Sequence, residues 1–450
     1  MIEICGIGGY SEVGKNMTAV KFNGDAVLFD MGYYMQKLMD FEESGGDRRT
    51  LNYKSMIQLG MIPDDRIIDS WKNNVKAIIP SHCHLDHIGA IPFMAPNYKA
   101  PVIGSPYTIE VLKNSIKDEE YNVPNEIKTL KTGKLMKISN DVSVELIHVT
   151  HSTPDSTIVA VHTPKGIILY ANDFKLDDTP TLGKKPDYDR LKELGETGKV
   201  KAIIMDALYS GANRRTPSEK VAREGVEEVV VDKINEGNAI FASCFASHIA
   251  RLKSFADFGR QIDRKVVFLG RSMSKYVNSA EELGIASLPG VEIIPYRAKI
   301  EKFLKKMKDK GPEKYLIVAT GGQGEPNSVL SRILKGSLHF KFTPNDTMIF
   351  SNMVIPVEPN IMNRVEMEKA FKQQGVRVVT SATNPNVHVS GHGSLKDMEE
   401  LIKMVNPENI IPSHGDLKKT EPLTKLTDKL GYRVGKELHL IENQTKIELK

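Results

Sequence analysis

The segment PSHCHLDHIGA (80–90) places three histidines and one aspartate within six positions, in a chain of 450 residues with 12 histidines. It follows the apolar run VKAII, which predicts a strand that ends where these polar side chains begin. His82 and His84 are two residues apart, so they point to the same side of an extended segment. Asp86 and His87 follow across a short turn. Imidazole and carboxylate groups are preferred zinc ligands, and clustering them without an ion is costly, so the segment predicts a metal site.

Four such groups exceed what a single tetrahedral ion takes from one turn, which indicates two neighbouring metals with further ligands from elsewhere. Each of the other candidates comes directly after an apolar, strand-like run: Asp30 in VLFDMG, His151 in HVTHSTPDS, Asp173 in YANDFK and His414 in IIPSHGD. Ligands at several strand ends on one sheet edge would form a site on a rigid scaffold. Taken alone, Asp30 is better interpreted as a cap or turn residue.

Composition places few limits on the partner. The chain is 40% hydrophobic and 26% charged, which is typical of a soluble globular protein, and no run of 18 apolar residues predicts a membrane span. The N-terminal residues do not resemble a signal peptide and the three cysteines are sparse, so we expect a cytoplasmic protein without a disulfide framework. The net charge of +4 is too mild to indicate a polyanionic partner by itself, and the lysine-rich run at 299–310 is typical of a solvated face.

Strand-like and helical patterns alternate along the chain, which predicts an α/β fold. The early strand candidates at 17–22, 25–30 and 75–80 include no intervening regular helix pattern and predict an antiparallel or mixed sheet. From about 206 to 375 the alternation of strand and helix becomes regular, which indicates a separate domain. Further candidates are a strand at 142–149 and helices at 105–116, 217–237 and 362–375.

The motif HCHLDH, together with the four strand-end residues, resembles the metallo-β-lactamase superfamily of binuclear hydrolases. The resemblance implies an αββα sandwich with the metals at one edge. It implies two Zn²⁺ ions per chain, with Mn²⁺ or Mg²⁺ as alternatives. One ion would be held by His82, His84 and His151, and the other by Asp86, His87 and His414. Asp173 would bridge the two ions, and Asp30 would orient a ligand histidine.

A stretch of about 240 residues separates YANDFK from IIPSHGD, far more than the sandwich needs. It contains GRSMSKY, ATGGQGEPNSVLSR and NVHVSGHGS, which resemble the β-CASP nucleases, and among them the ribonuclease J family in its shorter archaeal form. The resemblance implies a β-CASP α/β domain inserted into the sandwich. We expect the inserted domain at 206–375, with the first part of the sandwich at 1–205 and the second at 376–450.

The resemblance also implies the functional residues. His392 would protonate or stabilise the leaving oxygen, Asp206 would orient His392, and Asp86 would act with them in catalysis. Small residues, hydroxyls and imidazoles around HVSGHGS suit a 5′-phosphate pocket. The expected substrate-binding residues are His388, Ser390, Gly391, Gly393, Ser394, Ser272 and Ser351.

The expected activity is that of a zinc-dependent 5′-to-3′ exoribonuclease in RNA decay and processing. It would favour single-stranded RNA with a 5′-monophosphate, release nucleoside 5′-monophosphates and form a homodimer. An endoribonuclease of the same superfamily is the first alternative, because it would share every metal ligand. A non-catalytic RNA-binding protein is an alternative of another class, which the complete ligand set disfavours. A small-molecule hydrolase would have no use for the large insertion.

Overall fold

The computed structural model describes residues 1–355 and 358–450, and the chain divides into two compact units. Unit 1 comprises 1–178, 184–216 and 391–450, and unit 2 comprises 179–183 and 217–390. Within these described residues, no helix combines the length and the apolar character that a bilayer crossing requires.

The first sheet of unit 1 has seven strands in the order β19-β1-β2-β3-β4-β5-β6. Its antiparallel part contains β19, β1, β2 and β3, and β3 to β6 run parallel. Of the two predicted alternatives, antiparallel or mixed, the sheet is therefore mixed. The strands are β1 (Ile2–Gly8), β2 (Met17–Phe22), β3 (Asp25–Phe29), β4 (Val75–Ile79), β5 (Val102–Gly104), β6 (Ile127–Thr129) and β19 (Thr445–Leu449).

The second sheet of unit 1 has six strands in the order β18-β11-β10-β9-β8-β7. Strands β7 to β10 are antiparallel, whereas β10, β11 and β18 are parallel neighbours. The strands are β7 (Leu135–Lys137), β8 (Ser143–His148), β9 (Thr157–Thr163), β10 (Gly166–Ala171), β11 (Val200–Asp206) and β18 (Ile410–Ser413). The pairing of β11 with β18 joins segments that lie far apart in the sequence.

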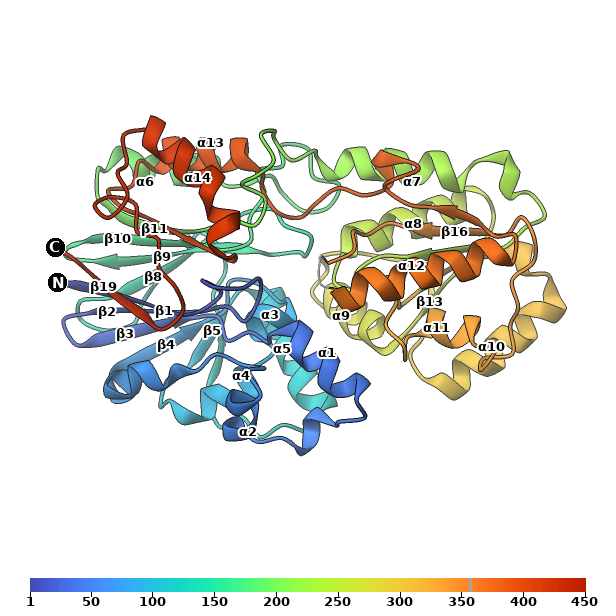
Figure 1. Ribbon diagram of the computed structural model, residues 1–450, viewed down its shortest axis with the longest axis horizontal. Coiled ribbons are helices and arrows are strands. Elements are labelled where there is room, and N and C mark those ends of the chain that lie inside the picture. Colours follow the sequence, from blue (N-terminus) through green and yellow to red (C-terminus); the bar gives the residue numbers. More distant parts are fainter. Residues whose placement is uncertain (356–357) are drawn as a thin grey trace. The chain divides into compact units, whose positions relative to one another are not determined.

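Apolar side chains from the inner faces of both sheets form one continuous core. Within it the rings of Phe29, on β3, and Tyr170, on β10, stack with centroids 4.7 Å apart. Helices lie on the outer faces, with α6, α13 and α14 over the second sheet and α2, α4 and α5 beside the first (Figure 1). The αββα sandwich is therefore confirmed. The helices of unit 1 are α1 (Met35–Glu43), α2 (Tyr53–Gln58), α3 (Leu85–Ile88), α4 (Ile91–Met94), α5 (Pro106–Asp118), α6 (Tyr188–Glu196), α13 (Leu395–Val405) and α14 (Leu417–Lys429).

Helix α13 shows how the sequence directs this packing. Its apolar residues Met398, Leu401, Ile402 and Val405 recur at helical spacing and are buried in the core shared with β10, β11 and β18. The Asp397 carboxylate accepts a hydrogen bond from the backbone N–H of Ser394, 2.9 Å away, at the start of the helix. The helix is thereby anchored at the end of the chain segment that carries HVSGHGS.

Unit 2 is built on a six-stranded parallel sheet in the order β14-β13-β15-β12-β16-β17. Its strands are β12 (Ile240–Ser243), β13 (Lys265–Leu269), β14 (Glu292–Ile294), β15 (Tyr315–Ala319), β16 (Thr347–Phe350) and β17 (Arg377–Val379). Its helices are α7 (Glu219–Val230), α8 (Ile249–Gln261), α9 (Arg271–Glu282), α10 (Arg297–Lys310), α11 (Val329–Leu334) and α12 (Glu358–Gln373). A separate apolar core supports this unit. Across both units, 3₁₀ turns lie at Arg48–Thr50, Asp65–Asn74, Ala95–Asn97, Lys233–Asn235, Pro312–Lys314 and Pro385–Val387.

The compact units do not divide at the residues we expected. The residues 206–216, predicted to open the insertion, belong to unit 1, because β11 ends at Asp206 and lies inside the second sheet. The residues 376–390, predicted to lie in the sandwich, belong to unit 2, because β17 pairs with β16 in the parallel sheet. The helix expected at 217–237 is shorter, since α7 ends at Val230 and a 3₁₀ turn follows.

Candidate metal centre

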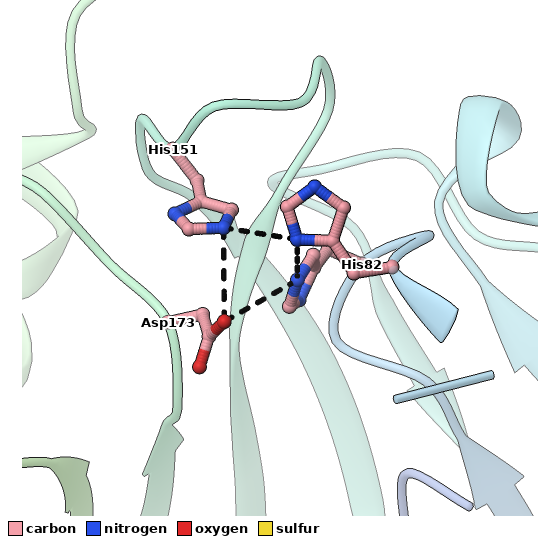
Figure 2. Close-up of side chains that lie close together, drawn as sticks. His82, His151 and Asp173 are labelled. Carbon is pink, nitrogen blue, oxygen red and sulfur yellow. Dashed lines mark hydrogen bonds and ion pairs between the residues drawn. The ribbon is translucent and has the colours of Figure 1, made fainter. Parts of the chain in front are cut away.

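The HCHLDH motif occupies the loop after β4 and the first turn of α3. His82 Nε2 lies 3.0 Å from His84 Nδ1, and His151 Nε2 lies 3.2 Å from the same His84 atom. Asp173 Oδ2 is 3.6 Å from both His82 Nε2 and His151 Nε2. Figure 2 shows His82, His151 and Asp173 turned toward one another. These four residues, His82, His84, His151 and Asp173, offer ligand atoms that all lie within 4.8 Å of each other.

A second group of donors shares Asp173 with the first. Its members are Asp86, His87, Asp173 and His414, again with ligand atoms within 4.8 Å of one another. His87 Nε2 lies 3.2 Å from Asp173 Oδ2 and 3.5 Å from Asp86 Oδ2. His414 Nδ1 lies 3.3 Å from Asp173 Oδ1. The structure therefore brings together all seven residues that the sequence suggested as metal ligands, in the two groupings that the resemblance implied.

Three of the strand-end residues share an unusual backbone conformation. Asp30 after β3, Asp173 after β10 and His414 after β18 have φ values of 54°, 55° and 58°. This left-handed region is uncommon for residues other than glycine, although Asp, Asn and His tolerate it best. Non-glycine residues in such conformations cluster at functional sites, where the surrounding structure holds them. Each sharp turn follows a strand and leaves a polar side chain at the cluster. The strands belong to two sheets, β3 to the first and β10 and β18 to the second, so the single sheet edge that we expected to carry all these residues is wrong.

Asp30 holds His87 in place. Its Oδ2 atom accepts hydrogen bonds from His87 Nδ1 at 2.7 Å and from the Tyr170 hydroxyl at 2.8 Å. Its Oδ1 atom accepts one from the backbone N–H of Ser81 at 2.7 Å. Because His87 Nδ1–H donates to the Asp30 carboxylate, His87 Nε2 faces Asp86 and Asp173. Asp30 is therefore more than a cap after β3.

His151 is oriented by a backbone carbonyl. Its Nδ1–H donates to Gly391 O at 2.7 Å, so its Nε2 faces the cluster. Gly391 itself is tightly packed, since a Cβ at this position would lie 2.8 Å from Ser152 Cβ. This contact gives Gly391, which we expected to bind substrate, a supporting function for a ligand histidine.

Asn16 is a residue that the sequence reasoning missed. It is buried, and its Nδ2 lies 3.0 Å from both Asp86 O and His87 Nε2. Its Oδ1 lies 3.0 Å from His414 Nδ1 and accepts a hydrogen bond from Asn172 Nδ2 at 3.1 Å. One side chain thus connects three members of the second donor group. Its place in GGYSEVGKN, a segment rich in turn residues, was the signal available for it.

His392 and Asp206 form a pair beside the cluster. His392 Nδ1–H donates to Asp206 Oδ2 at 2.7 Å, and its Nε2 lies 3.8 Å from Asp173 Oδ2. Asp206 is fully buried at the end of β11. Burial lowers the pKa of His392, but the carboxylates of Asp173 and Asp206 outweigh it and raise the pKa to about 9.

The environment favours neutral imidazoles in the first donor group. Burial, reinforced by neighbouring histidines, lowers the pKa of His82 and of His151 well below the usual range. Burial also lowers the pKa of His84 to about 4. Burial opposes ionisation of Asp173 as well, but His414 and His87 lower the pKa of its carboxyl group well below the usual value. Neutral imidazole and ionised carboxylate are the forms that bind metal ions.

The donor set fits divalent cations. It contains nitrogen and oxygen ligands of the kinds that zinc takes, and they converge from several strand ends. Asp173 Oδ1 is buried and, among the described residues, makes no hydrogen bond. A buried polar atom without a hydrogen-bond partner is costly, and a cation bound at the carboxylate would satisfy it. These residues therefore form a cluster able to bind metal.

The remaining substrate-binding candidates of unit 1 lie at the start of α13. Gly393 N–H donates to Phe174 O at 2.6 Å, and a Cβ at Gly393 would lie 2.9 Å from Asp397 Cβ. The Ser394 hydroxyl shares a 2.8 Å hydrogen bond with the Thr216 hydroxyl. Both residues thus have local structural partners, and their contact with substrate stays a prediction.

Within unit 2, the fully buried Arg251 organises the segment that carries His388. Its Nη1 donates to Val387 O at 3.1 Å and lies 3.4 Å from His388 Nδ1. The Ser351 hydroxyl is also buried and donates to Val387 O at 2.6 Å, so it supports the same segment. The other two candidates are partly exposed, Ser272 in the first turn of α9 and Ser390 at the end of the unit.

Comparison with known protein families agrees with this architecture. A model of the metallo-β-lactamase superfamily matches residues 12–209, and one of the Zn-dependent metallo-hydrolase RNA specificity domain matches residues 375–435. A model of the ribonuclease J β-CASP domain matches residues 237–367. The fold and the shared-aspartate cluster thus define a metallo-β-lactamase-superfamily protein with an inserted β-CASP domain.

Sequence comparison with individual proteins identifies the family within this superfamily. The chain is 40% identical to ribonuclease J of Pyrococcus abyssi, over 100% of this chain and 97% of the relative. It is 39% identical to ribonuclease J of Methanocaldococcus jannaschii, over 98% of this chain and 97% of that protein. The chain belongs to the ribonuclease J family. A solved structure of a protein of unknown function from Enterococcus faecalis shares the fold, with a TM-score of 0.63, 17% identity and 99% coverage of both chains.

Proposed function

We propose that this chain is a metal-dependent ribonuclease, and within that class a 5′-to-3′ exoribonuclease acting on single-stranded RNA with a 5′-monophosphate. The observation that carries the proposal is Asp173, whose carboxylate belongs to two metal-donor groups and lies 3.8 Å from His392. Membership of the ribonuclease J family and the match to an RNA specificity domain support RNA as the substrate.

Two Zn²⁺ ions are the proposed cofactors, one for each of the two four-residue donor groups. When bound, such ions would polarise a phosphodiester and lower the pKa of water to a value near neutrality. Residues of the chain hold the ligand histidines in the orientation that metal binding requires. Asp30 and Gly391 O fix the rings of His87 and His151, so that a ligand nitrogen of each faces Asp173.

His392 is the proposed group for the leaving 3′ oxygen. Asp206 binds its Nδ1–H, which leaves Nε2 on the side of Asp173, where a scissile phosphate would lie. A proton on Nε2 could then pass to the leaving oxygen as the P–O bond breaks. Asp206 acts through His392 and is a positioning residue.

Recognition of the 5′ end is assigned to the HVSGHGS segment. His388 Nδ1 faces the Arg251 guanidinium, and burial together with Arg251 and His248 lowers the pKa of His388 well below its usual value. His388 and Ser390 would bind the terminal phosphate as hydrogen-bonding groups. An enzyme that captures the 5′ end in this way is committed to stepwise cutting from that end.

The test uses one RNA sequence in three forms: linear with a 5′-monophosphate, linear with a 5′-hydroxyl, and circular. We expect release of nucleoside 5′-monophosphates from the first form, slower release from the second, no cutting of the circle, and loss of activity with EDTA. Asp173→Asn should abolish hydrolysis, whereas Asp189→Asn, an exposed aspartate of α6, should retain it.

Cutting of the circular RNA would identify an endonuclease, and RNA binding without any hydrolysis would identify a non-catalytic binding protein. Elemental analysis of the purified protein tests the two zinc ions. The homodimer and the cytoplasmic location stay predictions, which light scattering and cell fractionation test.

A further inference from the structure

Unit 2 contains a cavity of about 400 Å³ between the edge strand β14 and helix α10. Phe303 and Tyr315 contribute aromatic surface to its lining, and β14 contributes Glu292 and Ile294. None of the metal-donor residues and none of the expected substrate-binding residues lines it. The cavity is therefore a feature that the proposed catalytic function does not use.

One face of α10 makes the cavity strongly basic. Lys299, Lys302, Lys306 and Lys310 all line it, and all four are exposed. Within the described part of the chain, none of them has an ion-pair partner. A further lining lysine, Lys265, is already paired with Glu292, the one acidic residue of the lining.

The spacing of these lysines is regular. Lys302, Lys306 and Lys310 follow each other at intervals of four residues, so they lie on one face of the helix, about 6 Å apart along its axis. Like charges at this spacing destabilise an isolated helix. A row of phosphates along an extended nucleic-acid strand has a comparable separation and the opposite charge, and its binding would relieve the repulsion.

An aromatic side chain adjoins the lysine row. Tyr296, at the start of α10, is 58% exposed, and the Lys299 ammonium lies 5.9 Å from its ring centroid. An exposed aromatic ring beside a basic groove is the arrangement on which unpaired bases stack while the backbone follows the cations. This combination favours a single nucleic-acid strand over a small anion.

We propose that this cavity, with the lysine row of α10 and Tyr296, is a second RNA-binding site that holds the sugar-phosphate backbone of single-stranded RNA. The inference rests on the proposed function, because it takes RNA as the substrate. It adds a contact that depends on RNA length and is independent of the chemistry of the 5′ end.

The test compares two variants of the same helix with equal charge change. Lys302→Ala/Lys306→Ala removes two lysines of the row, whereas Lys305→Ala/Lys308→Ala removes two exposed lysines that do not line the cavity. Binding of a fluorescent, unstructured 30-nucleotide RNA is measured by anisotropy over a range of salt concentrations, with both variants in an Asp173→Asn background that prevents hydrolysis. Hydrolysis of a 5′-phosphorylated trinucleotide is measured with the same lysine variants carrying Asp173.

We expect the first variant to bind the long RNA about tenfold more weakly at low salt, with the slope of log K against log salt reduced by about 1.4. The second variant should keep the slope of the parent, and both should hydrolyse the trinucleotide at the wild-type rate. Equal losses in the two variants, or no loss in the first, would overturn the second site. Absence of trinucleotide hydrolysis in the wild type would instead overturn the proposed function. The two failures can be distinguished, because the binding comparison is made in a background that does not hydrolyse RNA.

Discussion

Replacing Arg251 by methionine should destabilise unit 2 by about 3–5 kcal/mol, because it leaves a buried carboxylate without its main counter-charge. Arg251 is fully buried, and its guanidinium binds both carboxylate oxygens of Glu219, at 2.7 and 2.8 Å. It also donates to the backbone oxygens of Ser351 and Val387, each at 3.1 Å. Burial opposes ionisation of Glu219, but Arg251 and His248 outweigh it and lower the pKa of its carboxyl group well below the usual value.

Calorimetry should show the loss of stability as a fall in unfolding temperature of about 10 °C, because 1 kcal/mol corresponds to about 2–4 °C for a unit of this size. Arg251→Met/Glu219→Leu should recover part of it, since neither charge is then buried alone. Arg223→Met is the matched control, because Arg223 pairs with Asp257 at the surface, where the two side chains are 32% and 17% exposed, and surface ion pairs contribute about 1 kcal/mol or less. An unfolding temperature of Arg251→Met within 2 °C of the wild type, or a double variant less stable than Arg251→Met, would refute this reasoning.

Two further predictions concern unit 1. Asn16→Ala should weaken zinc binding by about 10- to 100-fold in a competition titration, because Asn16 contacts Asp86, His87 and His414; an unchanged zinc affinity would exclude this role. Glu145→Gln should reduce the acid sensitivity of folding. Burial raises the pKa of Glu145, but hydrogen bonds from His162 and Arg190 outweigh burial and lower this pKa from the usual 4.5 to about 2. Because the pKa is lower in the folded state, the stabilisation is present above pH 4.5 and is lost as the pH falls toward 2. The free energy of unfolding in urea should therefore vary less between pH 4.5 and pH 2 in the variant than in the wild type.

The metal cluster could be predicted because each donor carries a local signal. His82, His84 and His87 stand together in one motif, and Asp173 and His414 each end a recognisable strand. The sequence patterns also indicated a separate domain of alternating strand and helix, but they did not predict that all strands of its sheet are parallel.

What the sequence did not reveal depends on contacts between distant segments. Asn16 meets His414 across almost the whole chain, and no periodicity marks an asparagine that links two histidines. Gly391 was expected to bind substrate, but its packing against Ser152 and its carbonyl contact with His151 become visible only in three dimensions. The boundaries of the compact units differ from the predicted ones for a similar reason, because no local sequence pattern marks the pairing of β11 with β18.

The left-handed turns mean that a residue at position 30, 173 or 414 must meet two requirements. It must supply a polar group to the cluster, and it must adopt a positive φ, which most residues other than glycine disfavour. Alanine would remove both properties at once, so its effect on activity would mix lost chemistry with a displaced strand end. At Asp30 and Asp173, asparagine tolerates the same turn and lacks only the carboxylate charge, so it separates the contribution of the charge from that of the chain path.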